Sequence, residues 1–437
     1  MTIQQIHDLF LKSSGISIDT RKIEPNSFFV AIKGERFDAN TFASEALEKG
    51  ASHVMIDNRD YYVDERTVLV EDSLKSLQEL AQYHRNFLKL PIIALTGSNG
   101  KTTTKELINV VLSKKFKTVA TVGNLNNHIG VPLTLLSFTK NTEIGIVEMG
   151  ANHQKEIEFL CEIAQPDYGF ITNFGKAHLE GFGGVEGVIK GKSEMYSFLK
   201  VNTKSVFVNL DDEIQNTKTV GIKRYTFSQN DKTTDVFIES VVANPFVKIS
   251  TLGVDINSHL IGLYNANNIC VAITVGHYFG VKPIEIKEAI ESYIPENNRS
   301  QLLVKNTNEI ILDAYNANPS SMKAALENFI QLDARGTAEQ SEAKPNKTIV
   351  IGDMYELGNE SLSEHKFIVE FLDKMVSFDC HLVGKEFFAN SIESDFLHFY
   401  PTFEDFAKYL STIKLKHRLL LIKGSRGMAL ERILNYL

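Results

Sequence analysis

The stretch PIIALTGSNGKT, residues 91–102, decides the fold of this 437-residue chain. Its first six residues are a short apolar run that predicts a β-strand. A helix is expected over residues 101–116, because Leu107, Val110 and Val111 are spaced to form one apolar face. A glycine-containing turn between a strand and a helix is the setting that a phosphate-binding loop requires.

The residue types in this turn suit nucleotide phosphates. Gly97 and Gly100 let backbone N–H groups approach phosphate oxygens, and the following helix directs its positive N-terminal end at the same charges. Lys101 would reach the outer phosphates, and Thr102 would offer a hydroxyl to Mg²⁺. The candidate ATP-binding residues of the turn are therefore Thr96, Gly97, Ser98, Asn99, Gly100, Lys101 and Thr102.

One position departs from the general phosphate-loop pattern. Leu95 stands where that pattern has its first glycine, so the loop is shorter than usual. A chance glycine-rich turn is the alternative interpretation. The combination of strand, GKT and helix favours the phosphate loop.

Short apolar runs alternate with helical patterns along most of the chain, which predicts parallel α/β sheets. At 437 residues the chain exceeds what one hydrophobic core usually serves. We expect three α/β domains: a small N-terminal one at 1–88, a central parallel-sheet ATPase domain at 89–299 and a Rossmann-like C-terminal one at 300–437. The predicted strands besides 91–96 are 27–32, 53–57, 144–149, 168–173, 206–210, 309–314, 348–353, 380–384 and 418–424.

Two connections of the last domain have their own patterns. Asn318 is expected to cap a helix and Pro319 to occupy its first position. The polar segment 334–347 is expected to be an exposed loop.

Charge and cysteine usage exclude several classes of function. A formal net charge of -8 argues against nucleic acid as the main partner. Cys161, Cys270 and Cys380 have no paired spacing, so we expect buried residues rather than disulfides or a zinc site. The start, MTIQQIHDLF, lacks a basic start followed by a long apolar stretch, and no apolar run approaches the length of a membrane span, so a cytoplasmic protein is expected.

Polar residues follow two of the predicted central strands. Glu148 ends an apolar run and would emerge at the ligand-binding edge of the sheet, as an Mg²⁺ ligand or as an ordinary surface glutamate. The stretch 172–184, TNFGKAHLEGFGG, has the character of an active-site loop. An isolated histidine is more often an ordinary polar residue than a site residue. The spacing alone does not decide which of these His178 is.

Seven blocks, met in order almost from end to end, resemble the Mur ligases, and in particular their dipeptide-adding branch. The blocks are TGSNGKTTTKE (96–106), GNLNNHIGVPLTLL (123–136), VEMGAN (147–152), AHLEGF (177–182), DAYNANPSSM (313–322), GDMYELG (352–358) and KGSRGMALE (423–431).

The resemblance implies ATP-dependent ligation of D-alanyl-D-alanine to UDP-N-acetylmuramoyl-tripeptide through an acyl phosphate, in peptidoglycan precursor synthesis. It implies ATP and Mg²⁺ as cofactors, and a monomer. The catalytic candidates are Lys101, His178 and Lys192, and the metal candidates are Thr102, Glu148, His178 and Lys192. Lys192 lies in GKSEMY (191–196), the segment where the family carries a carbamylated lysine, and a plain surface lysine is the alternative.

The resemblance also assigns nucleotide and substrate residues. YNANN (264–268) is similar to the family's adenine-contact segment, although two asparagines alone would be helix caps. The further ATP candidates are Asn265, Asn268, Arg299, Asp313 and Tyr315. The substrate candidates are Thr20, Arg21, Lys33 and Asp38 for the UDP end, and Asn126, Asn127, Asn316, Asn318, Ser425 and Arg426 elsewhere; Asp353 and His365 also lie in matching blocks.

Some points stay open. Family members often carry a histidine where this chain has Asn40 after Ala39, so contacts made by that histidine are in doubt. The rival functions are a Mur-type or folylpolyglutamate-type ligase that adds a single amino acid, and a nucleotide-binding switch without ligase activity. NANPSSM and GDMYELG favour the dipeptide-adding branch, but the third residue of the tripeptide, lysine or diaminopimelate, is left undecided.

Overall fold

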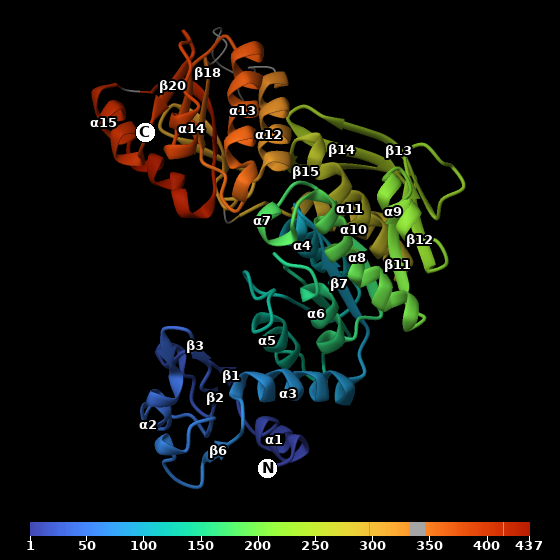
Figure 1. The fold of residues 1–437 in the computed structure, drawn as a ribbon. Coiled ribbons are helices and arrows are strands. Elements are labelled where there is room, and N and C mark those ends of the chain that lie inside the picture. The colour runs from blue at the N-terminus through green and yellow to red at the C-terminus, as the bar shows by residue number, and fades with distance from the viewer. Residues whose placement is uncertain (297, 333–345, 414) are drawn as a thin grey trace.

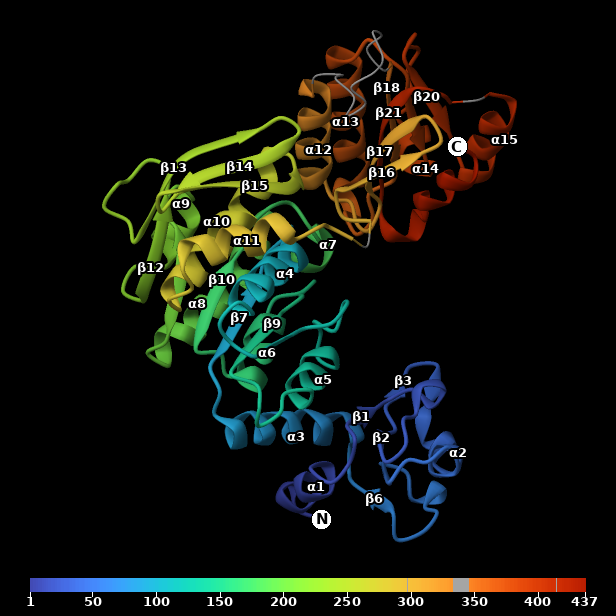
Figure 2. The ribbon, with the colours of Figure 1, turned by 180° about the vertical axis from the view of Figure 1, so that it is seen from behind.

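The chain is arranged as three lobes in the order of the sequence, with the second lobe joined to the other two (Figure 1 and, from behind, Figure 2). The structure, a computed structural model, describes residues 1–296, 298–332, 346–413 and 415–437. Within these ranges no helix combines the length and the apolar character needed to cross a membrane.

The middle lobe is built on one sheet of nine strands in the order β15-β14-β13-β12-β11-β10-β7-β9-β8. The strands from β13 to β8 pair in parallel, whereas β13, β14 and β15 pair antiparallel. The strands are β7 (Ile92–Thr96), β8 (Thr118–Ala120), β9 (Ile144–Glu148), β10 (Tyr168–Ile171), β11 (Ser205–Asn209), β12 (Lys223–Ser228), β13 (Val236–Ala243), β14 (Phe246–Thr251) and β15 (Val254–Ile261).

Helices cover both faces of this sheet, so β7 is apolar on both sides. Ile92 and Ala94 pack into one core, and Ile93 and Leu95 pack into the other. The middle-lobe helices are α4 (Lys101–Leu112), α5 (Gly130–Leu136), α6 (Glu156–Ala164), α7 (Leu179–Phe182), α8 (Val185–Val201), α9 (Glu213–Lys218), the 3-10 turn η4 (Leu263–Asn265), α10 (Ala266–Tyr278) and α11 (Pro283–Ser292).

The parallel register brings three chain segments to the same edge of the sheet. Leu95 of β7 pairs with Glu148 of β9, and Thr96 pairs with Ile171 of β10. The turn after β7, the carboxylate of Glu148 and the segment after Ile171 therefore emerge side by side. This is the edge at which α/β sheets bind ligands.

The N-terminal lobe has a four-stranded parallel sheet, β1-β2-β5-β6, and a two-stranded ribbon, β3-β4. Its strands are β1 (Ile16–Ser17), β2 (Phe28–Val30), β3 (Lys33–Gly34), β4 (Phe37–Asp38), β5 (His53–Ile56) and β6 (Thr67–Leu69). Its helices are α1 (Ile3–Phe10), η1 (Thr20–Lys22), η2 (Ala39–Phe42), α2 (Ala43–Glu48), η3 (Arg59–Tyr61) and α3 (Ser73–Leu88).

Helix α3 joins the first two lobes. Residues of α1, α3 and β2 share one hydrophobic core with residues of α5 and α6, so apolar packing is continuous across the boundary expected at residue 88. Arg85 strengthens this junction: its guanidinium donates to the backbone oxygens of Ala164 (3.2 Å) and Gln165 (3.0 Å) and to Oδ2 of Asp167 (2.8 Å).

The C-terminal lobe has a six-stranded sheet, β16-β17-β21-β18-β19-β20, that is parallel except for the β16–β17 pair. Helices α12 and α13 cover one face, and α15 covers the other. The strands are β16 (Gln301–Lys305), β17 (Asn308–Asp313), β18 (Asn346–Gly352), β19 (Cys380–Val383), β20 (Leu397–Tyr400) and β21 (Arg418–Lys423). The helices are α12 (Pro319–Gln331), η5 (Gly358–Glu360), α13 (Ser361–Met375), α14 (Lys385–Ala389), α15 (Phe403–Thr412), η6 (Arg426–Met428) and η7 (Leu430–Asn435).

Most predicted elements are present, with small differences at their ends. All ten predicted strands exist, and Asn318 caps α12 with Pro319 in its first turn. The helix expected over 101–116 ends at Leu112, because Ser113 begins a tight turn in which the N–H of Phe116 bonds back to the Leu112 oxygen. The three cysteines are buried and free.

The predicted loop at 334–347 is tested only at its end. Residues 334–345 lie outside the described part of the chain. Residues 346 and 347 were wrongly included, because they already pair with β21 as the start of β18.

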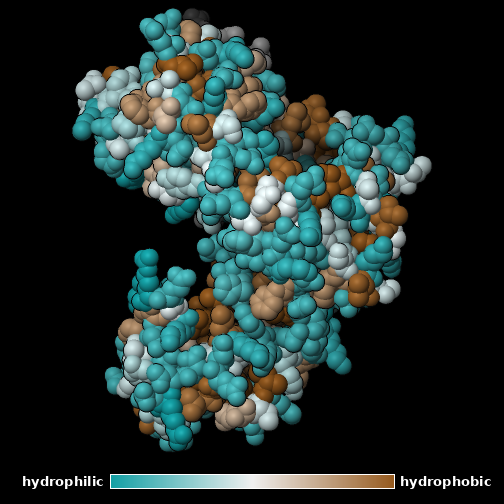
Figure 3. All heavy atoms as spheres, in the orientation of Figure 1, coloured by the Kyte–Doolittle hydropathy of each residue, from teal (hydrophilic) through white to brown (hydrophobic). Residues whose placement is uncertain are grey.

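The outer two lobes face each other across a hollow (Figure 3). The N-terminal lobe contacts the middle lobe through α3, and the C-terminal lobe contacts it through the segment around α7. The division at residues 88 and 299 stays a prediction, although both positions fall between sheets.

We predict that Arg85→Ala destabilises the N-terminal half of the protein by about 3 kcal/mol, because it breaks a largely buried ion pair. This loss in the free energy of unfolding lies at the low end of the range for broken buried ion pairs. The reason is that Asp167 keeps a second cationic partner, Lys204, at 2.6 Å. Thermal unfolding would measure it as a lower midpoint. Arg66→Ala, which removes a solvent-exposed pair with Asp64, is the matched control and should leave the midpoint unchanged. Equal midpoints for the two variants would contradict this role for Arg85.

Candidate active site at the phosphate loop

The turn between β7 and α4 is held against two neighbouring segments so closely that it needs glycine. A Cβ atom on Gly97 would lie 1.8 Å from the Thr172 hydroxyl oxygen, and one on Gly100 would lie 2.5 Å from Asn268 Oδ1. Both glycines also have positive φ angles, 148° and 79°. Leu95, the departure from the general pattern, is a buried core residue of β7.

The segment after β10 fastens this turn in place. The Ser98 N–H donates to the Asn173 backbone oxygen (3.1 Å), and the Asn99 N–H donates to Asn173 Oδ1 (3.1 Å). The Thr172 hydroxyl donates to the Asn99 oxygen at 2.6 Å. The conformation of the loop is therefore set by tertiary contacts before any ligand arrives.

Lys101 lies in the mouth of the loop. Its ammonium donates to the carbonyl oxygens of Gly97 (2.8 Å) and Ser98 (3.4 Å). Burial lowers the pKa of Lys101, and the nearby Glu148 carboxylate opposes that shift. The ammonium is thus placed where an anion entering the loop would meet it.

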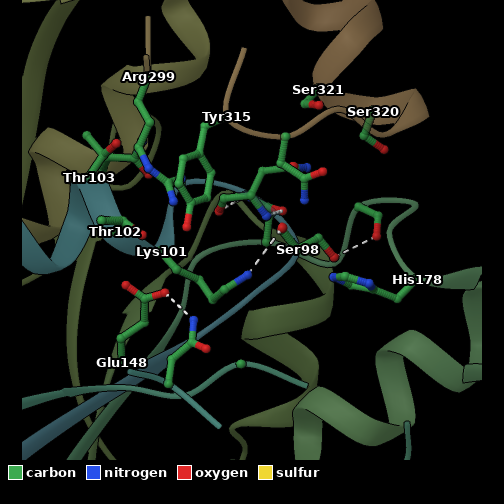
Figure 4. A pocket seen from close by; sticks show the side chains of 18 of the residues that line it. Ser98, Lys101, Thr102, Thr103, Glu148, His178, Arg299, Tyr315, Ser320 and Ser321 are labelled. Carbon is green, nitrogen blue, oxygen red and sulfur yellow. Dashed lines mark hydrogen bonds between the residues drawn. The ribbon is translucent and has the colours of Figure 1, made fainter. Parts of the chain in front are cut away.

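A cavity of about 650 Å³ opens beside the loop, between the middle and C-terminal lobes. Figure 4 shows Lys101, Glu148, His178, Arg299 and Tyr315 around it. The predicted site residues that line it are Ser98, Asn99, Gly100, Lys101, Thr102, Asn126, Asn127, Glu148, His178, Asn265, Asn268, Arg299, Asp313, Tyr315 and Asn316.

Glu148 is almost fully buried, and only one of its two carboxylate oxygens has a hydrogen-bond partner in the described structure. Its Oε1 accepts from the Asn126 side chain at 2.8 Å, whereas its Oε2 is buried without a hydrogen-bond partner in the described structure. An unpaired carboxylate oxygen in a buried position is costly unless a cation or donor meets it. This oxygen, with the hydroxyl of Thr102 in the same cavity, fits a hard cation such as Mg²⁺.

His178 points its ring into the cavity from the start of α7 (Figure 4). Its buried Nδ1 lies 2.5 Å from Oε2 of Glu356, a residue of the C-terminal lobe. The same contact lowers the pKa of Glu356. The imidazole is therefore held between two lobes.

Lys192 lies on α8, behind the cavity wall and outside its lining. The side chain is only 1% exposed, and its ammonium lies 5.1 Å from the centre of the Phe182 ring. Burial lowers the pKa of Lys192 well below its usual value, and Lys101 lowers it further. Its amine is thus shifted toward the neutral form, which is the nucleophilic one.

Asn265 and Asn268 are buried, and both have structural partners. Asn268 accepts from the Thr104 hydroxyl (3.0 Å) and donates to Asn265 Oδ1 (2.9 Å), while Asn265 donates to the Ile261 oxygen (2.8 Å). These amides connect α10 to the phosphate-loop helix. Their side chains line the cavity but are already occupied in supporting the loop.

The C-terminal lobe adds a stack and an ion pair to the cavity. The Arg299 guanidinium lies 3.6 Å from the centre of the Tyr315 ring, as a cation–π contact. Asp313 pairs with the buried Lys423 at 2.6 Å. Together they form a wall with an aromatic face, two cations and one carboxylate.

The remaining C-terminal candidates lie at the edge of the site or behind it. Asn318 donates to the Asn99 side chain at 2.7 Å, which joins the C-terminal lobe to the phosphate loop. Ser425 is buried and accepts from the Tyr355 N–H, whereas Arg426 is exposed and pairs with Glu431. Asp353 and His365 are also buried in the lobe, where they accept backbone N–H groups of Phe387 and Met354.

The four N-terminal candidates are remote from this cavity, in a different lobe. Arg21 is exposed and pairs with Asp19, Thr20 starts η1, Lys33 is exposed on β3, and Asp38 caps η2. Thr96, the last residue of β7, and Gly97, the first residue of the turn, also lie outside the lining.

Asn40 explains one departure from the family pattern. It is fully buried and joins Asp38 to Asp57, with both side-chain contacts at 2.7 Å. At this position the Asn40 side-chain amide therefore connects two segments of the N-terminal lobe by hydrogen bonds.

The sequence alone missed several lining residues. Lys423 stands at the end of a predicted strand and within a family-like block, a signal that could have identified it. Asn124 and Tyr264 also stand in family-like segments, and Asn173 stands in the stretch interpreted as an active-site loop. Ser300 gave no such signal, because ordinary polar residues in loops are common. The lining residues that were missed include Thr103, Asn124, His128, Asn152, Glu156, Asn173, Tyr264, Ser300, Ser320, Ser321 and Lys423.

Three family models match the chain in succession. They describe the Mur ligase family catalytic domain at residues 12–85, the Mur ligase middle domain at 95–276 and the Mur ligase glutamate ligase domain at 298–426. A UDP-N-acetylmuramoyl-tripeptide--D-alanyl-D-alanine ligase of Bacillus subtilis is 34% identical, over 96% of this chain and 92% of that protein. The ligase of the same name from Escherichia coli is 32% identical, over 100% and 98%.

The chain belongs to the Mur ligase family. Solved structures agree with this: MurF from Acinetobacter baumannii has a TM-score of 0.84 at 29% identity, covering 99% of this chain and 98% of that one. MurF of Thermotoga maritima in complex with ADP has a TM-score of 0.82 at 27% identity, covering 98% and 97%. A UDP-N-acetylmuramoyl-L-alanyl-D-glutamate--2,6-diaminopimelate ligase shares the fold, with a TM-score of 0.53 at 17% identity.

We predict that Asn268→Ala destabilises this Mur ligase by about 1–3 kcal/mol even without nucleotide, because it leaves the buried Thr104 hydroxyl and Asn265 amide without a shared partner. Denaturant unfolding of the ligand-free protein would measure the loss. Asn124→Ala, an exposed residue of the same cavity, is the control and should be neutral. Unchanged stability of Asn268→Ala would show that the residue serves the ligand alone.

Proposed function

We propose that this Mur ligase joins D-alanyl-D-alanine to UDP-N-acetylmuramoyl-tripeptide, with ATP as the energy source, to give UDP-N-acetylmuramoyl-pentapeptide, ADP and phosphate. The reaction is the one that the names of the two full-length relatives state. We place it in the cytoplasm, where ATP is available.

The observation that carries the proposal is one cavity lined by both a phosphate loop and the C-terminal lobe. A nucleotide-binding switch needs the loop, but it has no need of a second lobe whose arginine, tyrosine and buried lysine complete the same cavity. Two substrates brought together between lobes need such an arrangement.

In the first step an oxygen of the terminal carboxylate of the tripeptide attacks the γ-phosphorus of ATP. The bond between that phosphorus and the bridging oxygen of ADP breaks, and an acyl phosphate forms. Lys101 and the N-terminal end of α4 face the transferred group, where they offset negative charge. They are positioned before the reaction, so little reorganisation is needed.

In the second step the amine of D-alanyl-D-alanine attacks the acyl carbon, and a tetrahedral intermediate forms. The carbon–oxygen bond to phosphate then breaks, and the amine gives up a proton as the amide forms. Lys101 and His178 lie around the cavity in which negative charge develops on the acyl oxygen.

Mg²⁺ would be held by Oε2 of Glu148 and the hydroxyl of Thr102, with His178 at a second position, and when bound it would neutralise charge on the phosphate oxygens. The buried, unpaired Glu148 oxygen supports this assignment.

Lys192 is proposed to carry a carbamate. A neutral amine attacks carbon dioxide, forms a nitrogen–carbon bond and loses a proton, which leaves an anionic oxygen ligand in place of a cation. Burial favours the neutral amine at this position, and the proximity of Lys101 disfavours a second positive charge. A plain ammonium here would be both buried and repelled.

The N-terminal candidates Thr20, Arg21, Lys33 and Asp38 are proposed to hold the UDP end of the substrate. Their lobe faces the C-terminal lobe across the hollow of Figure 3, so a long substrate would extend from one lobe to the other. We propose that both outer lobes move toward the middle lobe during turnover.

The substrate assignment is tested by phosphate release with UDP-N-acetylmuramoyl-tripeptide and ATP. We expect D-alanyl-D-alanine to support turnover at least about 100-fold better than D-alanine, D-glutamate or diaminopimelate. A pocket that hydrogen-bonds a dipeptide leaves some of its polar groups unpaired when a single amino acid binds instead. Tripeptides that end in lysine and in diaminopimelate are compared in the same assay. Preference for a single amino acid would reject the proposal.

The role of Lys192 is tested separately from nucleotide binding. Lys192→Ala should bind ADP with unchanged affinity by calorimetry, but should lose at least about 100-fold in product formation, since it removes charge stabilisation from the cavity. Lys190→Ala, an exposed lysine two positions earlier on α8, is the control. Wild-type activity should also fall in buffer depleted of carbon dioxide and return with bicarbonate. Full activity of Lys192→Ala would reject the role.

A further inference from the structure

The segment between β8 and α5, residues 121–126, lies along the end of β9 and holds Glu148 from two sides. The Thr121 hydroxyl oxygen accepts the backbone N–H of Glu148 at 3.0 Å. Beyond Glu148, the N–H of Gly150 donates to the backbone oxygen of Asn126 at 2.8 Å. The Asn126 side-chain amide itself donates to Oε1 of Glu148 at 2.8 Å (Figure 4). Within the described part of the chain, this amide is therefore the hydrogen-bond partner of the carboxylate.

The segment is anchored by bonds in which that amide takes no part. Lys105 of α4 donates from its ammonium to the Thr121 backbone oxygen at 2.7 Å. The Thr121 N–H donates to the Ile146 oxygen of β9 at 2.9 Å, and the Asn126 N–H donates to the Asn124 oxygen at 2.7 Å. We therefore expect the segment to keep its path when the Asn126 side chain is removed.

Gly150 leaves the space in which the amide lies. A Cβ atom on Gly150 would lie 2.9 Å from both Cγ and Oδ1 of Asn126, and 3.1 Å from its Nδ2. Gly150 does not have a positive φ angle, so its backbone conformation is open to alanine. Gly150→Ala would therefore displace the amide from Glu148 without removing any polar group.

We propose that Asn126 is a positioning residue, whose amide holds Oε1 of Glu148 and so leaves Oε2 as the oxygen that meets the cation. The last torsion of a glutamate side chain is soft, so a hydrogen bond to one oxygen decides where the other oxygen lies. Residues that contact a metal ligand and keep it in orientation raise the affinity for the metal. This role rests on the proposed metal role of Glu148.

The chemistry of the donor suits this role. An amide donates a hydrogen bond but carries no charge, so Glu148 keeps its negative charge for a cation. A lysine or arginine at the same place would form a charged pair with the carboxylate and compete with the cation. The arrangement also accounts for one paired and one unpaired oxygen on the same buried carboxylate.

This role differs from the substrate contact that the family resemblance implies for Asn126. The amide nitrogen already donates to Glu148, so Asn126 would act on the substrate through the carboxylate and the cation. Loss of a substrate contact raises the KM for the tripeptide even at saturating Mg²⁺. Loss of positioning instead raises the Mg²⁺ concentration that gives half-maximal turnover.

The first measurement is the Mn²⁺ affinity of the full-length protein in the presence of ADP, by electron paramagnetic resonance. Asn126→Ala should bind Mn²⁺ about tenfold or more weakly than the wild type, because a metal ligand that loses its orienting partner loses affinity on this scale. Gly150→Ala should show a loss of the same order. Val122→Ala, whose side chain is 72% exposed in the same segment, is the control and should match the wild type.

Two further readouts distinguish positioning from a merely structural role and from a substrate contact. ADP affinity without metal, measured by calorimetry in the presence of a chelator, should be the same in Asn126→Ala and the wild type. In the phosphate-release assay, saturating Mg²⁺ should restore the turnover of Asn126→Ala without a change in the KM for the tripeptide.

Three results would overturn the positioning role. They are wild-type Mn²⁺ affinity in Asn126→Ala, an equal loss of its metal-free ADP affinity, and a loss of Mn²⁺ affinity that is absent from Gly150→Ala. A raised KM for the tripeptide at saturating Mg²⁺ would return Asn126 to the substrate contact and would likewise overturn it.

Glu148→Gln separates this role from the function on which it rests. If Glu148→Gln binds Mn²⁺ as tightly as the wild type, the metal role of Glu148 is wrong, and the role of Asn126 falls with it. If Glu148→Gln loses affinity and Asn126→Ala does not, only the role of Asn126 is overturned. The ligase reaction itself is tested by the substrate comparison and stands or falls apart from both results.

Discussion

The close approach of the phosphate loop to the end of β10 and to α10 is the constraint on which the rest of the structure depends. No side chain fits at positions 97 and 100, and Thr172, Asn173 and Asn268 hold the loop from below. The start of α4 and the Lys101 side chain are thereby held at one cavity. An anion that enters meets donors that are already in place, which is the condition for strong electrostatic stabilisation.

Buried charge is concentrated around this loop. Glu148 and Lys192 are buried and Lys101 is partly buried, and for both lysines burial lowers the pKa. Charges in such a medium interact more strongly than at the surface, so each unpaired group raises the free energy until a ligand meets it. In the proposed function, substrate phosphates, a cation and a carbamate would supply partners for these groups.

The C-terminal lobe contributes to the site as much as to its own fold. Asn318 reaches the phosphate loop, Tyr315 and Lys423 form a wall of the cavity, and Glu356 reaches His178. The cavity is therefore completed by residues of two lobes, and it depends on the packing of one lobe against the other.

The sequence by itself determined the architecture and the phosphate loop, because both depend on local patterns. Apolar runs of strand length, helical periodicity, a GKT turn and the strand end that indicated Glu148 are properties of neighbouring residues, and the family resemblance then supported Glu148 and His178. Only the tertiary structure decided which distant residues share the cavity, that Asn265 and Asn268 hold the loop, that α4 ends at Leu112, and that Glu356 meets His178. These outcomes depend on strand register and on the packing of one lobe against another, and neither is contained in the order of residues around any one motif.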